Sequence, residues 1–108
     1  MVDPDAHGAV AGFATLVVAN AVTKIDALAI IALTLDAPVQ DARTARPWIP
    51  LAEHAWIEID IPKFGEPPPL AIDVCSALGE DHARLEALGL AARLEPVTGW
   101  RIRPDFPI

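Results

Sequence analysis

The sequence predicts a two-layer α+β sandwich, in which helices pack on one face of an antiparallel sheet. Three observations carry this prediction. Isoleucines alternate with polar residues over 54–61, a second alternating run follows at 70–75, and leucines recur at helical spacing over 80–95. A period of two is typical of a half-buried strand, and spacings of three and four are typical of an amphipathic helix. We therefore expect strands and helices to share one core.

The first third of the chain allows two interpretations. In the preferred one, residues 13–19 form a strand and 22–35 a helix, which gives the order βαββαβ of a ferredoxin-like fold. In the alternative, residues 6–24 form a helix and 27–36 a buried strand, which gives αβββαβ. Short apolar runs do not distinguish helix from strand by periodicity alone, so both interpretations stay open.

The two alternating runs are expected to pair as an antiparallel hairpin. Pro62 ends the first strand, and a turn-rich segment connects it to the second. In the second strand, the residues expected to point into the core are Leu70, Ile72 and Val74.

The C-terminal third predicts a helix and a last short strand. Glu80 and Asp81 place negative charge in the first turn of the helix, where it suits the helix dipole. Pro96 is expected to end the helix. Residues 100–103 alternate again, which predicts a strand with its two arginines pointing outward.

Composition and charge limit the class of protein. The 108 residues suit one compact domain, and an apolar content of 53% excludes wholesale disorder. Eight basic and fifteen acidic residues give a net charge of −7, which argues against a nucleic-acid or membrane surface as partner. The single cysteine fits a reducing compartment, and the first residues lack the basic start of a secretory signal. We expect a cytoplasmic protein.

The usual catalytic and cofactor motifs are absent from the sequence. It contains no Cys-x-x-Cys, no Gly-x-Gly-x-x-Gly, no P-loop and no His-Glu-x-x-His motif. One serine and no tyrosine leave little for chemistry that depends on these side chains. We therefore expect no cofactor and no metal.

The second face of the sheet is the first candidate site. Its expected outward residues are His54, Trp56, Glu58, Asp60, Asp73, Cys75, Arg101 and Arg103. The polar members His54, Glu58, Asp60 and Asp73 have the chemistry of acid–base groups or metal ligands. The alternative is a solvated face on which the arginines pair with carboxylates. A large ring such as Trp56 among polar neighbours is typical of an interface or a ligand wall.

Residues 37–53 form the second candidate site. They show no clear strand or helix pattern, so we expect a long ordered connection or a lid. Arg43, Arg46 and Trp48 are the candidates there for binding an anion or an acidic patch on a partner. The alternative is a strap that packs Trp48 onto the edge of the sheet.

Together these features favour a small acidic binding or assembly module. The hypothesis is a homodimer built on the open sheet face, which holds a partner protein or a small anionic ligand. The alternative is a small cofactor-free enzyme that uses the carboxylates and histidine of the same face.

Overall fold

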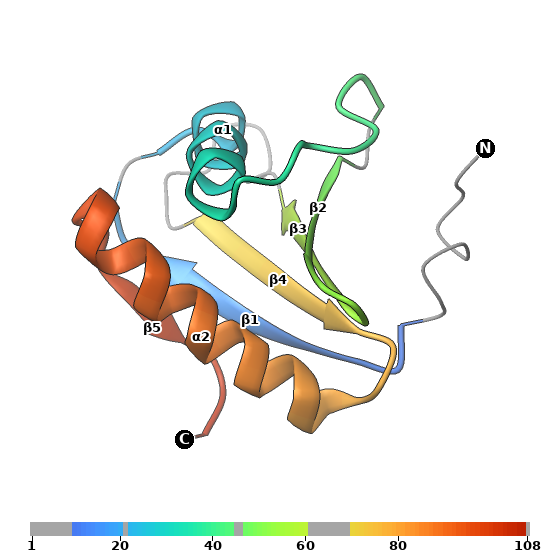
Figure 1. Cartoon of the computed structure of the whole chain (residues 1–108). Helices are drawn as coiled ribbons and strands as arrows, with labels where there is room; N and C mark the ends of the chain where they lie inside the picture. The colour runs from blue at the N-terminus through green and yellow to red at the C-terminus, as the bar shows by residue number, and fades with distance from the viewer. Residues whose placement is uncertain (1–9, 21, 45–46, 61–69, 108) are drawn as a thin grey trace.

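A computed structural model of the chain describes residues 10–20, 22–44, 47–60 and 70–107, except the side chain of Asp60. Within this part, five strands form one sheet and two helices pack on it (Figure 1). In chain order the elements are β1 (Gly12–Val18), α1 (Lys24–Leu35), β2 (Trp48–Ala52), β3 (Ala55–Asp60), β4 (Leu70–Ser76), α2 (Glu80–Thr98) and β5 (Ile102–Pro104).

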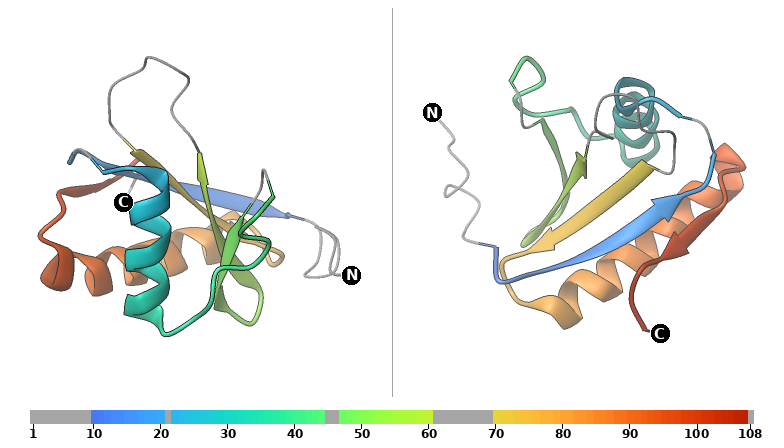
Figure 2. Two further views of the ribbon diagram at one scale, coloured as in Figure 1. Left: turned by 90° about the horizontal axis from the view of Figure 1, so that it is seen from above. Right: turned by 180° about the vertical axis from the view of Figure 1, so that it is seen from behind.

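The sheet has the strand order β2-β3-β4-β1-β5, and all neighbours are antiparallel. Strands β4 and β5 therefore run parallel on either side of β1, and α2 connects them. Both helices cover the same face of the sheet (Figure 2). The predicted two-layer α+β architecture with an antiparallel sheet is confirmed.

The expected ferredoxin-like order βαββαβ is wrong, because the observed order is βαβββαβ. The additional strand is β2, which lies in the connection 37–53 where the sequence shows no strand pattern. Pro50 interrupts that pattern in the sequence. A proline is tolerated here because β2 is an edge strand, where one missing N–H need not break the ladder. The pairing with β3 also shifts register just after this proline.

The first third of the chain follows the preferred interpretation, a strand and then a helix. Thr23 caps α1, since its hydroxyl accepts the Asp26 N–H at 3.1 Å. Asp36 ends the helix in the left-handed conformation, with φ at 52°. No helix in the described part of the chain is long and apolar enough to cross a membrane.

Helix α2 continues past Pro96 to Thr98, so the prediction that this proline ends the helix is wrong. The helix ends instead at Gly99, whose φ of 71° is left-handed and whose N–H bonds the Glu95 carbonyl at 3.0 Å. A proline so close to the C-terminus removes little of the helix's hydrogen bonding, and the last turn stays closed.

The core lies between the sheet and the two helices. Alternate strand residues enter it, including the predicted Leu70, Ile72 and Val74. The largest side chains that are completely buried include Leu16, Ile31, Ile49, Ile57, Leu90 and Leu94. Trp100 closes the core beside β5. Every strand therefore has one apolar side and one side free for other residues.

Gly12 lies where β1 passes the first turn of α2. A Cβ atom at this position would lie 2.6 Å from the Glu80 Cα and from the Gly79 carbonyl carbon. These are backbone atoms, which cannot rotate aside. Gly12→Ala is therefore expected to lower the free energy of unfolding by about 1–3 kcal/mol in urea denaturation.

Gly89→Ala is the matched control for this prediction. Gly89 is exposed on α2, and a Cβ there would meet nothing within 4 Å. Alanine is the better helix former, so this variant is expected to be more stable by about 0.5–1 kcal/mol. Effects of the same sign in both variants would contradict the close approach of β1 to α2.

Candidate functional site

A polar row crosses the face of the sheet that turns away from the helices. The register pairs Trp48 of β2 with Glu58 of β3, and Glu58 with Asp73 of β4. Asp73 in turn lies opposite Thr15 of β1. Residues paired across a sheet point to the same side, so these four side chains lie next to one another.

A more apolar row lies beside the first, two residues away along each strand. It consists of Pro50, Trp56, Cys75 and Phe13, which are paired in this order across the same four strands. The two rows together form what we call the outer sheet face. The most exposed ring on it is Phe13, with 59% of its surface accessible.

Hydrogen bonds hold both carboxylates of the outer sheet face in place. Glu58 Oε2 accepts from the Trp56 indole N–H at 3.2 Å and from the Cys75 thiol at 3.4 Å. The Thr15 hydroxyl donates to Asp73 Oδ1 at 2.7 Å. The positions of the acidic groups are thus fixed by their neighbours on a rigid sheet.

Glu58 and Asp73 lie directly opposite each other on neighbouring strands. The Cβ atoms of such a pair are about 4.5–5.5 Å apart. Two negative charges this close create a local potential that attracts a cation able to contact both. A guanidinium or ammonium group has the charge and the hydrogen-bond donors for this position.

Trp56 is more deeply buried than the sequence indicates. It lies on the outer sheet face as predicted, but only 3% of its surface is accessible. Its register neighbours Pro50 and Cys75 flank it, and its indole N–H is bonded to Glu58. The expectation of an exposed ring that needs a partner to cover it is therefore wrong. Cys75 is also buried, which agrees with its expected role as a small apolar side chain.

The structure does not bring His54 to the carboxylate pair. His54 is exposed in the turn between β2 and β3, four residues before Glu58. Four strand residues span about 13 Å. Asp60 pairs through its backbone with Ala71, and its side chain lies outside the described residues. Of the four candidate acid–base residues, only Glu58 and Asp73 are seen together.

Arg101 and Arg103 are exposed at the far edge of the sheet, as predicted. They border a shallow hollow beside β5 together with Val17 and Glu95. The expected cross-strand pairs are not seen, because no ion pair joins either arginine to a described carboxylate. Strand β1 also separates β5 from Asp73 on β4.

The connection before β2 runs along the edge of the sheet. Gln40 and Trp48 exchange two backbone hydrogen bonds, of 2.7 and 3.1 Å, and the Trp48 indole donates to Asp41 Oδ2 at 3.1 Å. Arg43 is exposed in the turn that follows Asp41, and Arg46 lies outside the described residues. The described part thus resembles the strap alternative, and it places another carboxylate beside Trp48.

No group of three or more histidine, cysteine or acidic side chains that could hold a metal ion occurs among the described residues.

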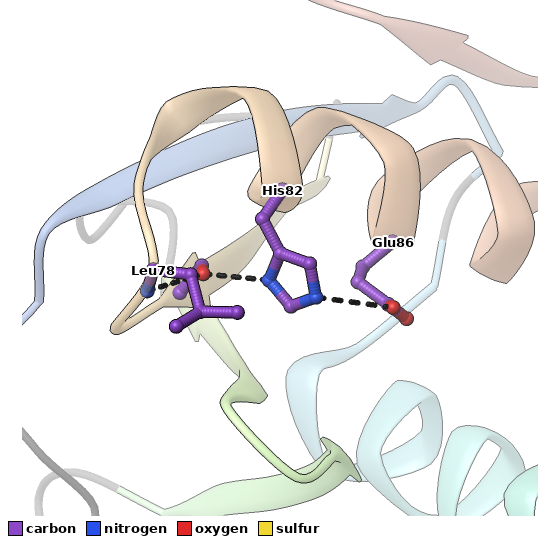
Figure 3. A network of polar contacts seen from close by, with 4 residues as sticks. Leu78, His82 and Glu86 are labelled. Atoms are coloured by element: carbon purple, nitrogen blue, oxygen red, sulfur yellow. Dashed lines mark hydrogen bonds and ion pairs between the residues drawn. The ribbon is translucent and has the colours of Figure 1, made fainter.

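Sequence reasoning missed a polar network between β4 and α2, shown in Figure 3. The Ser76 hydroxyl lies 2.7 Å from His82 Nδ1, and His82 Nε2 lies 3.4 Å from Glu86 Oε1. The Leu78 N–H donates to the same hydroxyl at 2.9 Å. A serine six residues before a histidine at the start of a predicted helix was the available signal.

This network has the residue types of a catalytic triad but not the access. Ser76 is completely buried, so its hydroxyl is closed to a substrate. Its oxygen also accepts the N–H of Leu78, in the turn that leads into α2. The network therefore fixes the turn between β4 and α2, and we assign it a structural role.

Ser76→Ala tests this role. The substitution leaves the buried Leu78 N–H and His82 Nδ1 without their partner, so the free energy of unfolding is expected to fall by about 1–3 kcal/mol. Urea denaturation measures the change.

Glu86→Gln is the control. It keeps an oxygen that accepts from His82 at a partly exposed position, so a change of about 0.5 kcal/mol or less is expected. A stability of Ser76→Ala equal to that of the unmodified chain would show that the network does not hold the turn.

Comparisons of this chain with protein-family models, with curated proteins and with solved structures give no match. The outer sheet face and the net charge are therefore the features on which a function rests.

Proposed function

We propose that the domain is a binding module whose outer sheet face receives a basic segment of a partner protein. The observation that carries this proposal is the carboxylate pair Glu58 and Asp73, opposite each other in the middle of the sheet. Arginine or lysine side chains supply the cation that such a pair attracts.

The apolar residues of the outer sheet face suit the same kind of partner. Phe13 is exposed on β1, and Trp48 is half-buried on β2, so aromatic rings lie on either side of the acidic pair. Arginine and lysine carry apolar stems that pack on such surfaces, and their charged ends are attracted to aromatic faces. A basic peptide segment could use both kinds of contact at once.

The net charge of the whole chain supports a basic partner. A charge of −7 gives the molecule a negative field, which speeds the encounter with a positive protein at low salt. The same field repels anions, which lowers the support for a small anionic ligand on the outer sheet face. Arg101 and Arg103 lie at the opposite edge of the sheet, away from this pair.

A second copy of the chain is a poorer partner for this face. A two-fold dimer brings identical patches together. Glu58 and Asp73 would then approach the same two carboxylates of the other copy, and like charges in an interface oppose association. The burial of Trp56 also removes the reason to seek a second copy as its cover. The outer sheet face is therefore proposed as the site of a different, basic protein.

Fluorescein-labelled hexa-arginine is a probe for this site. We expect the full chain to bind it with an anisotropy change that weakens as NaCl rises from about 20 to 200 mM. The double variant Glu58→Gln/Asp73→Asn keeps the acceptor oxygens for Trp56, Cys75 and Thr15 but removes both charges. It should bind the probe about tenfold more weakly, which is about 1.4 kcal/mol.

The control is Asp81→Asn/Glu95→Gln. Both residues are exposed on α2, and the change in net charge is the same two units. This variant should lose about threefold or less in affinity. Equal losses in the two double variants would reduce the interaction to the general field of an acidic protein, and no binding by the unmodified chain would contradict the proposal.

A further inference from the structure

Helix α1 is apolar on both of its sides. Ala27, Leu28 and Ile31 are buried against the sheet and α2. On the opposite side, Ile25 and Leu33 are exposed, with 78% and 82% of their surfaces accessible. A helix that is apolar all round is expected to be buried all round. The free surface of α1 is therefore unusual for a face that meets only water.

The exposed apolar residues of α1 lie in one stripe. Ile25, Ala29 and Leu33 follow one another at intervals of four residues, which places them above one another along the helix. Ala29 is exposed at the centre, and a larger side chain stands on each side of it. A small central residue allows a second helix to approach closely, and the flanking residues give it two apolar contacts.

We infer that this stripe is a homodimer interface in which α1 packs antiparallel against α1 of a second copy. An antiparallel pair about Ala29 brings Ile25 of one copy opposite Leu33 of the other, and the reverse. The stripe is thus complementary to itself, as a two-fold interface requires.

The charges at the two ends of α1 favour the same arrangement. Asp36 is exposed at the C-terminal end, and its place on the helix is about one turn beyond Leu33 on the same side. Antiparallel packing puts it beside the N-terminal turn of the other helix, where the helix dipole is positive and Lys24 adds a positive charge. Neither Lys24 nor Asp36 takes part in an ion pair within the described chain.

The interface is independent of the proposed function, because α1 and the outer sheet face lie on opposite sides of the sheet (Figure 2). It is also small. Twelve helical residues span about 18 Å, so we expect a weak dimer at the low end of stable interface areas.

Sedimentation velocity of the full chain tests the inference. Between about 5 and 500 μM protein, the unmodified chain should pass from monomer to dimer. Leu33→Glu should weaken the dimer at least about tenfold, because it places two new charges in the stripe. Leu85→Glu is the matched control, since Leu85 is 69% exposed on α2 and outside the stripe. It should leave the dimer unchanged.

Cysteine cross-linking tests the geometry. Ala29→Cys should form a disulfide-linked dimer under mild oxidation, because the two central residues of an antiparallel pair come within disulfide reach. Ala92→Cys, at an exposed position of α2, is the control and should not. The native Cys75 is buried.

A chain that stays monomeric at every concentration would overturn the inference, and so would equal effects of Leu33→Glu and Leu85→Glu. Cross-linking through Ala92→Cys as readily as through Ala29→Cys would overturn the antiparallel geometry. Binding of hexa-arginine by the Leu33→Glu variant separates the two proposals, since it should match that of the unmodified chain.

Discussion

The arrangement of this domain depends on one constraint: both helices pack on the same face of the sheet. Alternate residues of each strand must therefore be apolar to meet them, as Leu16, Ile57 and Ile72 do. The residues between them are released from the core and can carry polar groups. The acidic pair, the tryptophans and the exposed phenylalanine all stand in these released positions. The same packing leaves the far side of each helix facing outward, where α1 carries its apolar stripe.

The released positions are used unevenly, and this unevenness is what suggests a function. Two carboxylates lie side by side in the middle of the sheet, held by neighbours on the same face. Groups fixed on rigid strands hold a ligand more accurately than groups on loops. The buried Trp56 contributes by holding Glu58 rather than by waiting for a partner. On the opposite side of the molecule, α1 offers an uncharged surface. A basic partner and a second copy of the chain would therefore not compete.

Residue patterns predicted the core better than the topology. The alternation over 54–61 and 70–75 and the leucines of α2 identified the central hairpin, the inward residues and the long helix. Strand β2 was missed because Pro50 breaks the alternation, and an edge strand tolerates what an inner strand would not. Within the site, the alternation placed Glu58 and Asp73 on one face. It did not show that they are opposite each other, since that depends on the register between strands. The Ser76–His82 contact likewise depends on a turn that no spacing describes.

The three tryptophans allow a direct test of the claim that the outer sheet face is the binding site. The Trp56 indole N–H bonds Glu58 and the Trp48 indole N–H bonds Asp41, whereas Trp100 closes the core. We would titrate hexa-arginine into the ¹⁵N-labelled chain and follow the three indole signals by NMR. The account predicts that the signals of Trp48 and Trp56 shift and that of Trp100 stays in place. No shift, or an equal shift of all three, would contradict it.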